Sequence, residues 1–330
     1  MNQKIDIGIV NYNGGDCLIK CIESIYLMSD VIVKLYVLDN MSSDDSIDVA
    51  EKKFPDCTFI RSKKNLGYAG GCNSLLKHFT ADIVAVCNMD LEFPSDWARE
   101  IVNCFNNVPD ASSISSLVIQ KDTNEIYASD IHFFWDLHPI CVCEKIDTEK
   151  EQQVFGAYGA VMAFRKEVFE KIGYFDDDYF LFFEETEFFL RMNINKLKVY
   201  LCPTARVFHH RSISTVRYST GKIYYSERNR IWTAFKYLPL WYFPLLFPLS
   251  ILRLYVMSKN GVPQEDGQGK KVRPLEIVLT LFKAWLCSLL ELNREWKKRR
   301  QIWKKTDVTP SYTLDIIKKY NLRFSQLRVK

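Results

Sequence analysis

The chain has 330 residues, 48% of them hydrophobic, so it can bury a substantial core in two or three domains, which excludes a disordered protein. Its net charge of +4 is uneven: residues 258–330 hold 17 Lys and Arg against 7 Asp and Glu, and residues 1–257 hold 27 against 33. A basic tail behind an acidic body indicates an anionic surface as partner.

The first 120 residues alternate short apolar runs with segments of helical periodicity. The runs IDIGIV, VIVKLYVL, CTFIR and DIVAVC predict four strands, and helices are expected over residues 17–27, 44–53 and 70–78. Near-continuous apolar strands joined by helices are typical of a parallel sheet covered on both faces. The sequence therefore predicts an α/β fold whose ligands bind at the carboxyl ends of the strands.

Each predicted strand is followed by a polar loop, and the four loops read NYNGGD, DNMSSDD, KKNLGYAGGCN and NMDLEF. Ordinary turn chemistry explains any one of them. Four such loops at one sheet edge offer donors, carboxylates and close backbone approach, which favours a polyphosphate or nucleotide pocket. Neither a GxGxxG dinucleotide fingerprint nor a P-loop is present, so those two nucleotide folds are excluded.

Single residues in and beyond these loops suit nucleotide and metal binding. Asp39 can accept hydrogen bonds from a base or a ribose, and Tyr12 can stack on a pyrimidine, although turn formation and packing explain both residues equally well. Asp90 follows the fourth strand and can hold a hard divalent cation. His209 is a candidate second ligand, and the mixed set suits Mn²⁺ as well as Mg²⁺. The alternative for His209 and His210 is a solvated or core position.

Between Lys121 and Gln153 the periodicity weakens, and we expect a flexible insertion on the acceptor side. The segment GAYGAVMAFRKEVFEKIG then predicts a strand followed by a helix. A short strand is expected near VYL, and a helix over Tyr224–Tyr237.

Three acids, Glu184, Glu185 and Glu187, crowd the start of a helix expected after the apolar run FLFF. The helix dipole by itself accounts for acids at this position. Desolvation beside the phenylalanines and mutual repulsion would also raise the pKa of these carboxyls toward the range useful to a general base.

Seven motifs occur in a fixed order: VNYNGG, LDNMSSDDS, NLGYAGGCN, NMD, GAVMAFRKEVFEKIGYFDDDYF, FEETEFFLR and FHHRS. In this order the chain resembles the family 2 glycosyltransferases over residues 4–235, particularly the bacterial rhamnosyltransferase-like branch. The resemblance implies a GT-A fold, a mostly parallel sheet flanked by helices. A catalytic domain would span residues 1–236, with a nucleotide-binding half over 1–120 and an acceptor half over 121–236, and a helical basic extension would span 237–330.

The resemblance also implies roles for particular residues. Asp90, the acid of the DxD-type motif, would bind Mg²⁺ or Mn²⁺ together with His209, and Glu185 would be the catalytic base. This chain departs from the family pattern in two places, since the DxD-type motif begins with Asn and the base is Glu rather than Asp, so Glu184 and Glu187 stay open as the base. The residues implied for the nucleotide and donor are Val10, Tyr12, Asn13, Asp39, Asn40, Asn65, Gly67, Asn88, Gly159 and Arg191.

The implied activity is inverting transfer of rhamnose or another hexose from a nucleotide-diphosphate donor, dTDP-rhamnose or a UDP-sugar. The acceptor would be a hydroxyl of a glycan or lipid-linked glycan in cell-surface polysaccharide synthesis. Two other classes stay open. A nucleotidyltransferase on a related sheet would need a basic glycine-rich first loop, which YNGGD is not, and a non-catalytic module that binds sugar nucleotides or glycans would not need the acids of FEETEFFLR.

The tail combines apolar runs with clustered cations. Residues 237–252 form an uncharged run with three prolines, shorter than the roughly 20 residues of a spanning helix. A second run, 275–292, precedes a basic segment in which Trp296 and Trp303 stand among six cations. The pattern predicts an interfacial element over 237–305 on anionic lipid, with a packed helix pair as the alternative. Nucleic acid is not expected, because no nucleic-acid motif accompanies the charge.

Ten cysteines occur without a CxxC pair, and the opening segment MNQKIDIGIV lacks the apolar stretch of a secretory signal. Reduced thiols are therefore expected. Together with the tail, this predicts a cytoplasmic protein that is peripheral on the inner face of the cytoplasmic membrane.

Overall fold

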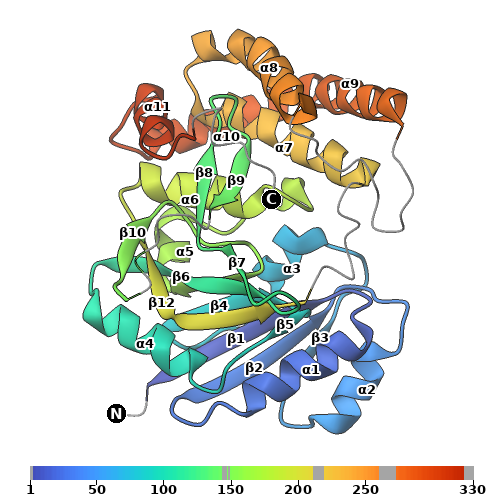
Figure 1. Ribbon diagram of the computed structural model, residues 1–330, viewed down its shortest axis with the longest axis vertical. Coiled ribbons are helices and arrows are strands. Elements are labelled where there is room, and N and C mark those ends of the chain that lie inside the picture. Colours follow the sequence, from blue (N-terminus) through green and yellow to red (C-terminus); the bar gives the residue numbers. More distant parts are fainter. Residues whose placement is uncertain (1–2, 143–146, 148, 211–218, 260–272, 323–330) are drawn as a thin grey trace. The chain divides into compact units, whose positions relative to one another are not determined.

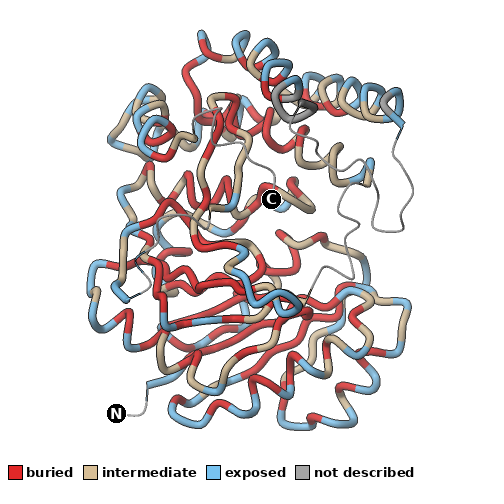
Figure 2. Tube along the Cα trace, viewed as in Figure 1, coloured by how far each residue is buried: buried red, intermediate tan, exposed pale blue. Residues whose placement is uncertain are grey.

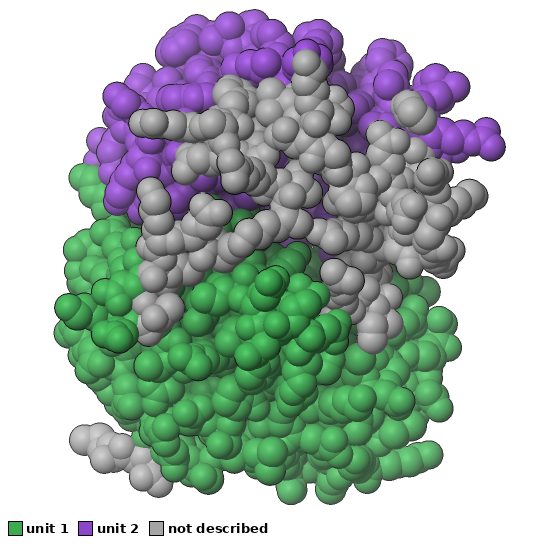
Figure 3. All heavy atoms as spheres, viewed as in Figure 1, with its two compact units in different colours: residues 1–130, 141–180, 196–214 green, residues 131–140, 181–195, 215–330 purple. Residues whose placement is uncertain are grey.

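The computed structural model describes residues 3–142, 147, 149–210, 219–259 and 273–322. Two compact units, coloured separately in Figure 3, make up the chain. Unit 1 comprises residues 1–130, 141–180 and 196–214, and unit 2 comprises residues 131–140, 181–195 and 215–330. Because each unit is assembled from separate stretches of sequence, packing does not divide the chain at a single position such as residue 236.

Unit 1 is built on a sheet whose strand order is β10-β12-β6-β11-β4-β1-β2-β3, with β5 paired to β12 and β7 to β6 (Figure 1). Strands β3, β2, β1 and β4 run parallel, and β11 lies antiparallel between β4 and β6. This confirms the α/β fold with a mostly parallel sheet. The strands are β1 (Lys4–Asn11), β2 (Ile32–Asp39), β3 (Thr58–Arg61), β4 (Ile83–Asn88), β5 (Leu91–Glu92), β6 (Ala111–Gln120), β7 (Ile126–Ala128), β10 (Gln152–Val154), β11 (Val161–Arg165) and β12 (Lys198–His209).

The helices of unit 1 connect these strands; α1, α2, α3 and α5 lie where the periodicity predicts helices, whereas α4 was not predicted. The helices are α1 (Gly15–Tyr26), α2 (Ser46–Lys53), α3 (Gly67–Leu76), α4 (Trp97–Asn107) and α5 (Glu167–Ile172), with a 3-10 turn η1 (Asp177–Tyr179).

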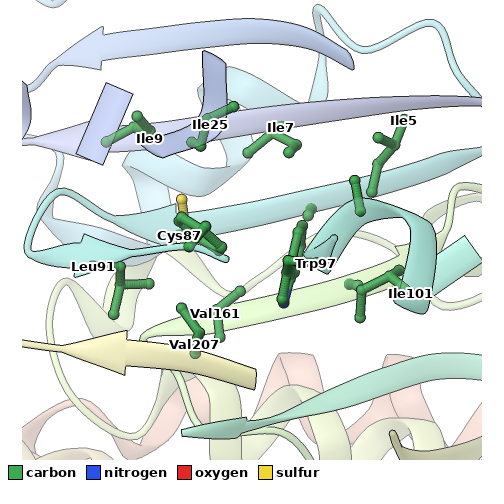
Figure 4. Packing of buried hydrophobic residues seen from close by; sticks show 14 of the residues in the cluster. Ile5, Ile7, Ile9, Ile25, Cys87, Leu91, Trp97, Ile101, Val161 and Val207 are labelled. Carbon is green, nitrogen blue, oxygen red and sulfur yellow. The ribbon is translucent and has the colours of Figure 1, made fainter. Parts of the chain in front are cut away.

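The core lies against both faces of the sheet, and β1 is buried on each side from Ile5 to Asn11. Ile5, Ile7 and Ile9 alternate along one face and are fully buried beneath α1 and α4, as Figure 4 shows. On the opposite face Gly8 leaves room for Phe79, since a Cβ at Gly8 would lie 2.6 Å from that ring. Burial on both faces is what a central parallel strand requires.

The segment expected as a flexible insertion is more regular than its sequence suggests. Its described part forms β7, β10 and a two-stranded sheet of β8 (Asp130–Phe133) and β9 (Pro139–Val142), while residues 143–146 and 148 lie outside the described residues. The short strand expected near VYL is also longer than predicted. It continues to His209 as β12, with a register shift between Cys202 and Arg206 that lets it stay paired with β6 past Pro203.

Unit 2 is mainly helical, which confirms the helical C-terminal region. No helix in its described part, or in that of unit 1, is long and apolar enough to cross a bilayer. Residues 260–272 and 323–330 of the predicted extension, and Arg211 and Ser212 of the FHHRS motif, lie outside the described residues. The elements are α6 (Glu184–Ile194), α7 (Thr220–Tyr237), η2 (Leu240–Leu245), α8 (Leu246–Lys259), α9 (Pro274–Leu290), α10 (Leu292–Lys304) and α11 (Pro310–Lys319).

Buried ion pairs link the helices of unit 2. Arg230 is fully buried on α7 and donates to Glu227 at 2.5 Å, and Arg253 of α8 donates to Asp136 at 2.7 Å. Trp285 of α9 donates its indole N–H to Glu227 at 2.9 Å. Each buried charge in this network meets an opposite charge, as burial away from water demands.

Candidate active site

The register of the sheet brings the carboxyl ends of β1, β2 and β4 to one edge of unit 1. Asn11 lies opposite Asp39, and Val10 lies opposite Asn88. Asp90 follows β4 directly. The polar loops after these three strands therefore share one edge, which is where an open α/β sheet binds its ligands.

Hydrogen bonds between the first two loops fix their shape. Asn11 Nδ2 donates to Ser42 Oγ at 3.2 Å, and the backbone N–H of Asn13 donates to the same oxygen at 3.0 Å. Asp39 Oδ1 accepts from the backbone N–H of Ser42 at 3.3 Å. The side chain of Tyr12, between these anchored positions, is 41% exposed and open to a stacking partner.

The third loop is held by two asparagines. Asn40 Nδ2 donates to Asn65 Oδ1 at 3.2 Å and to the carbonyl of Gly67 at 3.0 Å, and its Oδ1 accepts from the N–H of Leu66. Gly67 has φ +68°, and a Cβ there would lie 2.0 Å from the carbonyl oxygen of Phe180. Glycine is required at this point both by backbone conformation and by space. Asn40, Asn65 and Gly67 therefore fix the backbone of the third loop at the ligand-binding edge of the sheet.

Three further residues expected at the donor site take part in packing. Val10 is buried against α3, where a Cβ on Gly71 would meet its side chain at 2.9 Å. Asn88 donates its backbone N–H to the carbonyl of Ala160. The carbonyl of Gly159 accepts from the hydroxyl of Tyr68 at 2.6 Å.

Asp90 and His209 meet although 119 positions separate them. The two-residue strand β5 pairs antiparallel with the end of β12, so that Leu91 lies opposite His209. The backbone N–H of His210 donates to the carbonyl of Asp90 at 3.0 Å, and Asp90 Oδ1 lies 3.4 Å from His209 Nε2. His210 turns to Glu92 instead, 3.2 Å away.

Asp90 is only 2% exposed, and in the part of the chain that the structure describes its Oδ1 has no hydrogen-bond partner. A buried carboxylate oxygen without a donor is costly, and a bound cation would remove that cost. The imidazole beside it is fixed by ring contacts with Tyr127 and Tyr158, whose centroids each lie 6.0 Å from that of His209. This arrangement suits a cation bound between the carboxylate and the imidazole.

The described residues supply part of the coordination shell of a divalent cation. In the part of the chain that the structure describes, no three His, Cys, Asp or Glu side chains converge on one point. Asp90 and His209 therefore offer two ligands, an oxygen and a nitrogen, of the six that Mg²⁺ or Mn²⁺ takes in octahedral geometry. The remaining positions would be filled by water and by oxygens of a bound anion, which is typical of a cation that is bound together with a phosphate substrate.

The acids expected as catalytic groups lie in unit 2, at the start of α6, and they differ from one another. The carboxylate of Glu187 has partners at both oxygens. Its Oε2 lies 3.0 Å from Arg191 Nη2, and its Oε1 lies 3.7 Å from Lys236 Nζ and accepts a hydrogen bond from the hydroxyl of Tyr237. Arg191 also lies 5.0 Å from the ring of Phe188. Glu187 and Arg191 therefore form a buried ion pair within unit 2.

Within the described residues, no cation lies in hydrogen-bonding range of Glu184 or Glu185, although the charge of Lys222 lowers the pKa of Glu185 slightly against the effect of burial. Burial, and next the charge of Glu185, hold the pKa of Glu184 well above its ordinary value, and Glu184 Oε2 is buried with no hydrogen-bond partner in the part of the chain that the structure describes. Burial also raises the pKa of Glu185, which is the more exposed of the two. Burial favours the protonated form of both carboxyls, and more strongly that of the deeper Glu184, so Glu185 is the better suited of the two to ionise and accept a proton.

The turn before these acids is strained. Phe182 and Phe183 have positive φ angles of 64° and 76°, which bulky residues rarely adopt. The side chain of Asn229, fully buried on α7, donates to the carbonyls of Leu181 and Phe182 at 3.1 and 2.6 Å. Strain of this kind persists where surrounding contacts impose it, and it clusters at functional sites.

Some residues of the site carried no usable signal in the sequence. Tyr127 and Tyr158 flank His209, but isolated tyrosines in an irregular segment look like packing. Asn229 and Tyr237 support α6 from a helix that begins 36 positions after Glu184. Ser42 is one of several polar residues of the loop DNMSSDD, and nothing in that sequence distinguishes it from its neighbours.

Comparisons with known proteins identify the family. Residues 6–173 match the family model described as "Glycosyl transferase family 2". The "Low-salt glycan biosynthesis hexosyltransferase Agl10" of Haloferax volcanii is 25% identical over 237 residues, covering 70% of this chain and 75% of that protein. The "N-acetylglucosaminyl-diphospho-decaprenol L-rhamnosyltransferase" of Mycobacterium tuberculosis is 23% identical over 295 residues, covering 79% of this chain and 95% of that protein.

Two solved structures share the fold. "GalNAc-T7 with UDP, GalNAc and Mn2+" superposes with a TM-score of 0.60 at 13% identity, covering 79% of this chain and 52% of that chain, so this protein spans about half its length. The "Mannosyltransferase PcManGT from Pyrobaculum calidifontis in complex with GDP-Man and Mn2+" gives a TM-score of 0.53 at 14% identity, covering 92% and 86%. These likenesses confirm the GT-A fold.

Proposed function

The chain belongs to glycosyl transferase family 2 and is a glycosyltransferase, and we propose that it moves a hexose from a nucleotide-diphosphate donor to an acceptor hydroxyl with inversion at the anomeric carbon. Rhamnose from dTDP-rhamnose is the first candidate, and UDP-sugars are the second. The observation that carries the proposal is the buried carboxylate of Asp90, whose Oδ1 has no hydrogen-bond partner and lies beside His209 at the ligand-binding edge of the sheet.

The nucleotide is proposed to bind along the loops after β1 and β2. Tyr12 is accessible for stacking on the base, and the carboxylate of Asp39 can accept hydrogen bonds from the base or the ribose. Asn13, Asn40, Asn65 and Gly67 support these loops, together with Val10 and Asn88 in the strands beneath them.

Asp90 and His209 are proposed to hold Mg²⁺ or Mn²⁺ against the diphosphate. A divalent cation in this place would neutralise the negative charge that grows on the leaving nucleoside diphosphate. The chain itself contributes a carboxylate and an imidazole that are already oriented, since Tyr127 and Tyr158 fix the ring of His209. Gly159 is proposed to leave room for the donor sugar.

Glu185 is proposed as the base that takes the proton of the acceptor hydroxyl. Its raised pKa brings it nearer to the working pH, where proton transfer is most efficient. Glu184 retains its own proton, and Glu187 is neutralised by Arg191 and Lys236, so neither is as well suited. Arg191 serves α6 through this ion pair rather than through a phosphate.

The acceptor is proposed to be a glycan or a lipid-linked glycan in the synthesis of a cell-surface polysaccharide. The Mycobacterium tuberculosis relative is named for a decaprenol diphosphate acceptor, which supports a lipid-linked substrate here. Residues 1–236 would then carry out the transfer, and residues 237–330 would keep the chain at the cytoplasmic face of the membrane.

A panel of nucleotide sugars tests the donor. The melting temperature of the full chain is measured with each sugar nucleotide in the presence and absence of Mn²⁺, because ligand binding stabilises the native state by mass action. We expect dTDP-rhamnose or a UDP-sugar to raise the melting temperature only with the metal, and the same donor to be turned over. Stabilisation by nucleoside triphosphates, with release of pyrophosphate from a sugar phosphate, would contradict glycosyl transfer and support a nucleotidyltransferase.

A non-catalytic binding module makes a different prediction for the acids of α6. If the chain only bound sugar nucleotides, then Glu184→Gln, Glu185→Gln and the double variant would all retain full function. Loss of turnover with retained donor binding in Glu185→Gln is the result expected of the enzyme.

A further inference from the structure

Helix α9 is apolar on two opposite faces, although only one of them is covered. Ala284 and Ser288 are fully buried against α7, and Trp285 reaches Glu227 of that helix with its indole N–H. The other face points away from these contacts and is exposed. A helix that is apolar all round is normally buried all round, so the bare face of α9 needs an explanation.

The bare face forms a continuous stripe at helical spacing. Phe282 is 67% exposed and Leu290 is 74% exposed, and Figure 2 shows most of α9 as exposed or intermediate. Scattered exposed apolar residues are ordinary, but a contiguous set marks an interaction surface. The stripe consists of Leu275, Val278, Leu279, Phe282, Leu286 and Leu290.

Helix α8 adds exposed apolar residues beside this stripe. Phe247 packs edge-on against Trp285 of α9 with ring centroids 5.4 Å apart, yet it is still more than half exposed. Ile251 and Tyr255 continue along α8, one turn apart, and both are more than half exposed. Together the two sets form what we call the α8–α9 apolar face.

Charge decides between the two occupants that an apolar face of this kind could take, a lipid surface or a second copy of the chain. The stripe on α9 is interrupted by one acid, Glu276, and α10 follows with Lys297, Arg300 and Lys304 exposed to solvent. Residues 258–330 carry ten more cations than acids. A second copy would bring the same positive charge to the contact, whereas an anionic lipid surface is complementary to it.

We propose that the α8–α9 apolar face lies in the headgroup region of an anionic bilayer, parallel to the membrane plane. The apolar side chains enter the acyl boundary, and the lysines and arginines of α10 contact lipid phosphates. Because no described helix can span a bilayer, the contact is peripheral. The inference assigns residues to the membrane side of the proposed function, but it does not depend on which sugar or acceptor is used.

Vesicle co-sedimentation of the full chain tests the proposal. Vesicles of phosphatidylglycerol and phosphatidylcholine in equal parts are compared with vesicles of phosphatidylcholine alone. The test variant is Leu279→Ser with Phe282→Ser, and the matched control is Leu27→Ser with Val49→Ser, two exposed apolar residues of unit 1. The test variant should lower the partition coefficient on the mixed vesicles by at least about tenfold, because it removes two inserted side chains. The control should bind as the native chain does.

A charge variant separates the two contributions to binding. Replacing Lys297, Arg300 and Lys304 by Gln should abolish the preference for phosphatidylglycerol while leaving weak binding to phosphatidylcholine. In the native chain, raising the salt concentration should weaken binding to the mixed vesicles, as expected of cations that contact lipid phosphates.

Three results would overturn the proposal. The first is equal binding by the native chain and the Leu279→Ser, Phe282→Ser variant. The second is a concentration-dependent dimer of the native chain, measured by analytical ultracentrifugation, that this variant abolishes without any vesicle binding; the face would then be an interface between copies. The third is a large drop in the melting temperature of the variant, which would mean that the face is covered inside the protein.

The failure of this proposal can be distinguished from the failure of the proposed transfer. Donor-dependent stabilisation with Mn²⁺ reports on unit 1 and should be the same in the Leu279→Ser, Phe282→Ser variant and the native chain. Loss of vesicle binding with intact donor stabilisation concerns the lipid contact alone.

Discussion

Buried carboxylates are accommodated in opposite ways in the two units. In unit 2, Glu187 is surrounded by Arg191, Lys236 and Tyr237, so its charge is compensated within the protein. In unit 1, Asp90 is as deeply buried, but among the residues that the structure describes its close basic partner is the imidazole of His209, 3.4 Å away, and its Oδ1 has no hydrogen bond.

The difference separates a structural acid from a ligand-binding one. A carboxylate that stabilises the fold has its partners in the chain, and removing it leaves cations unpaired. A buried carboxylate that binds a ligand destabilises the unliganded protein, because its charge is compensated only when the ligand binds. Glu184 is a third case, since burial raises its pKa and so favours its uncharged, protonated form.

The largest effect in unit 2 is expected for the proposed base. Glu185→Gln should lower kcat by about 1,000-fold, within the range typical of a lost general base, while the KM for the donor changes little. Steady-state kinetics with a soluble acceptor measures both. If Glu184→Gln loses kcat and Glu185→Gln keeps it, the assignment of the base is reversed.

The structural acid should affect stability instead. Glu187→Gln removes the carboxylate that Arg191 and Lys236 share and should lower the free energy of unfolding by roughly 3 kcal/mol, measured by denaturant titration. Glu167→Gln is the matched control, because Glu167 forms an exposed pair with Lys171 at the same helical spacing. Its effect should stay below about 1 kcal/mol. Equal losses in both variants would refute the structural role of Glu187.

The two neighbouring histidines should differ in their effect on metal use. His209→Gln should raise the Mn²⁺ concentration needed for half-maximal turnover by about tenfold or more, because it removes a ligand next to Asp90. His210→Gln should leave that concentration unchanged, since His210 pairs with Glu92 at the surface. A metal titration of each variant decides the matter, and a larger shift in His210→Gln would exclude His209 as the ligand.

The smallest effect is on the pH dependence of stability. The folded-state pKa of Glu184 is raised above its unfolded value, so the neutral acid favours the native state at low pH. This contribution is present below the unfolded pKa and is lost as pH rises toward and through the folded pKa. As the pH rises from the unfolded pKa toward the folded pKa, the native chain should therefore lose more stability than Glu184→Gln, measured as the melting temperature across the range. Parallel curves would contradict the protonated state.

The sequence predicted the first four strands because β1, β2 and β4 are largely buried and read as mostly apolar runs, and because the edge strand β3 is a short β-rich run between two polar loops. It could not predict β5, whose two residues are too short for any periodicity, yet β5 is the element that pairs with the end of β12 and brings His209 to Asp90. The full length of β12 could not be predicted either, because Pro203 normally ends a strand. In the structure a register shift between Cys202 and Arg206 lets the pairing with β6 continue past the proline.

The sequence indicated the acids of α6 because three of them lie close together, but it did not indicate how their surroundings differ. Whether a glutamate is paired, protonated or free depends on Lys236 and Tyr237, which are about 50 positions away and read as ordinary residues of another helix. The positive φ angles of Phe182 and Phe183 were equally unpredictable, because they depend on Asn229 holding two carbonyls.

The central claim is that Asp90 is buried in order to bind a cation, and Asp90→Asn tests it most directly. Metal-dependent turnover of the donor and the melting temperature are measured together, with Glu92→Gln as the neighbouring control. Turnover should fall by about 10,000-fold, since the metal contributes several kcal/mol to the transition state, and the melting temperature without metal should not fall. Unchanged turnover, or a loss of stability like that of Glu187→Gln, would contradict the account.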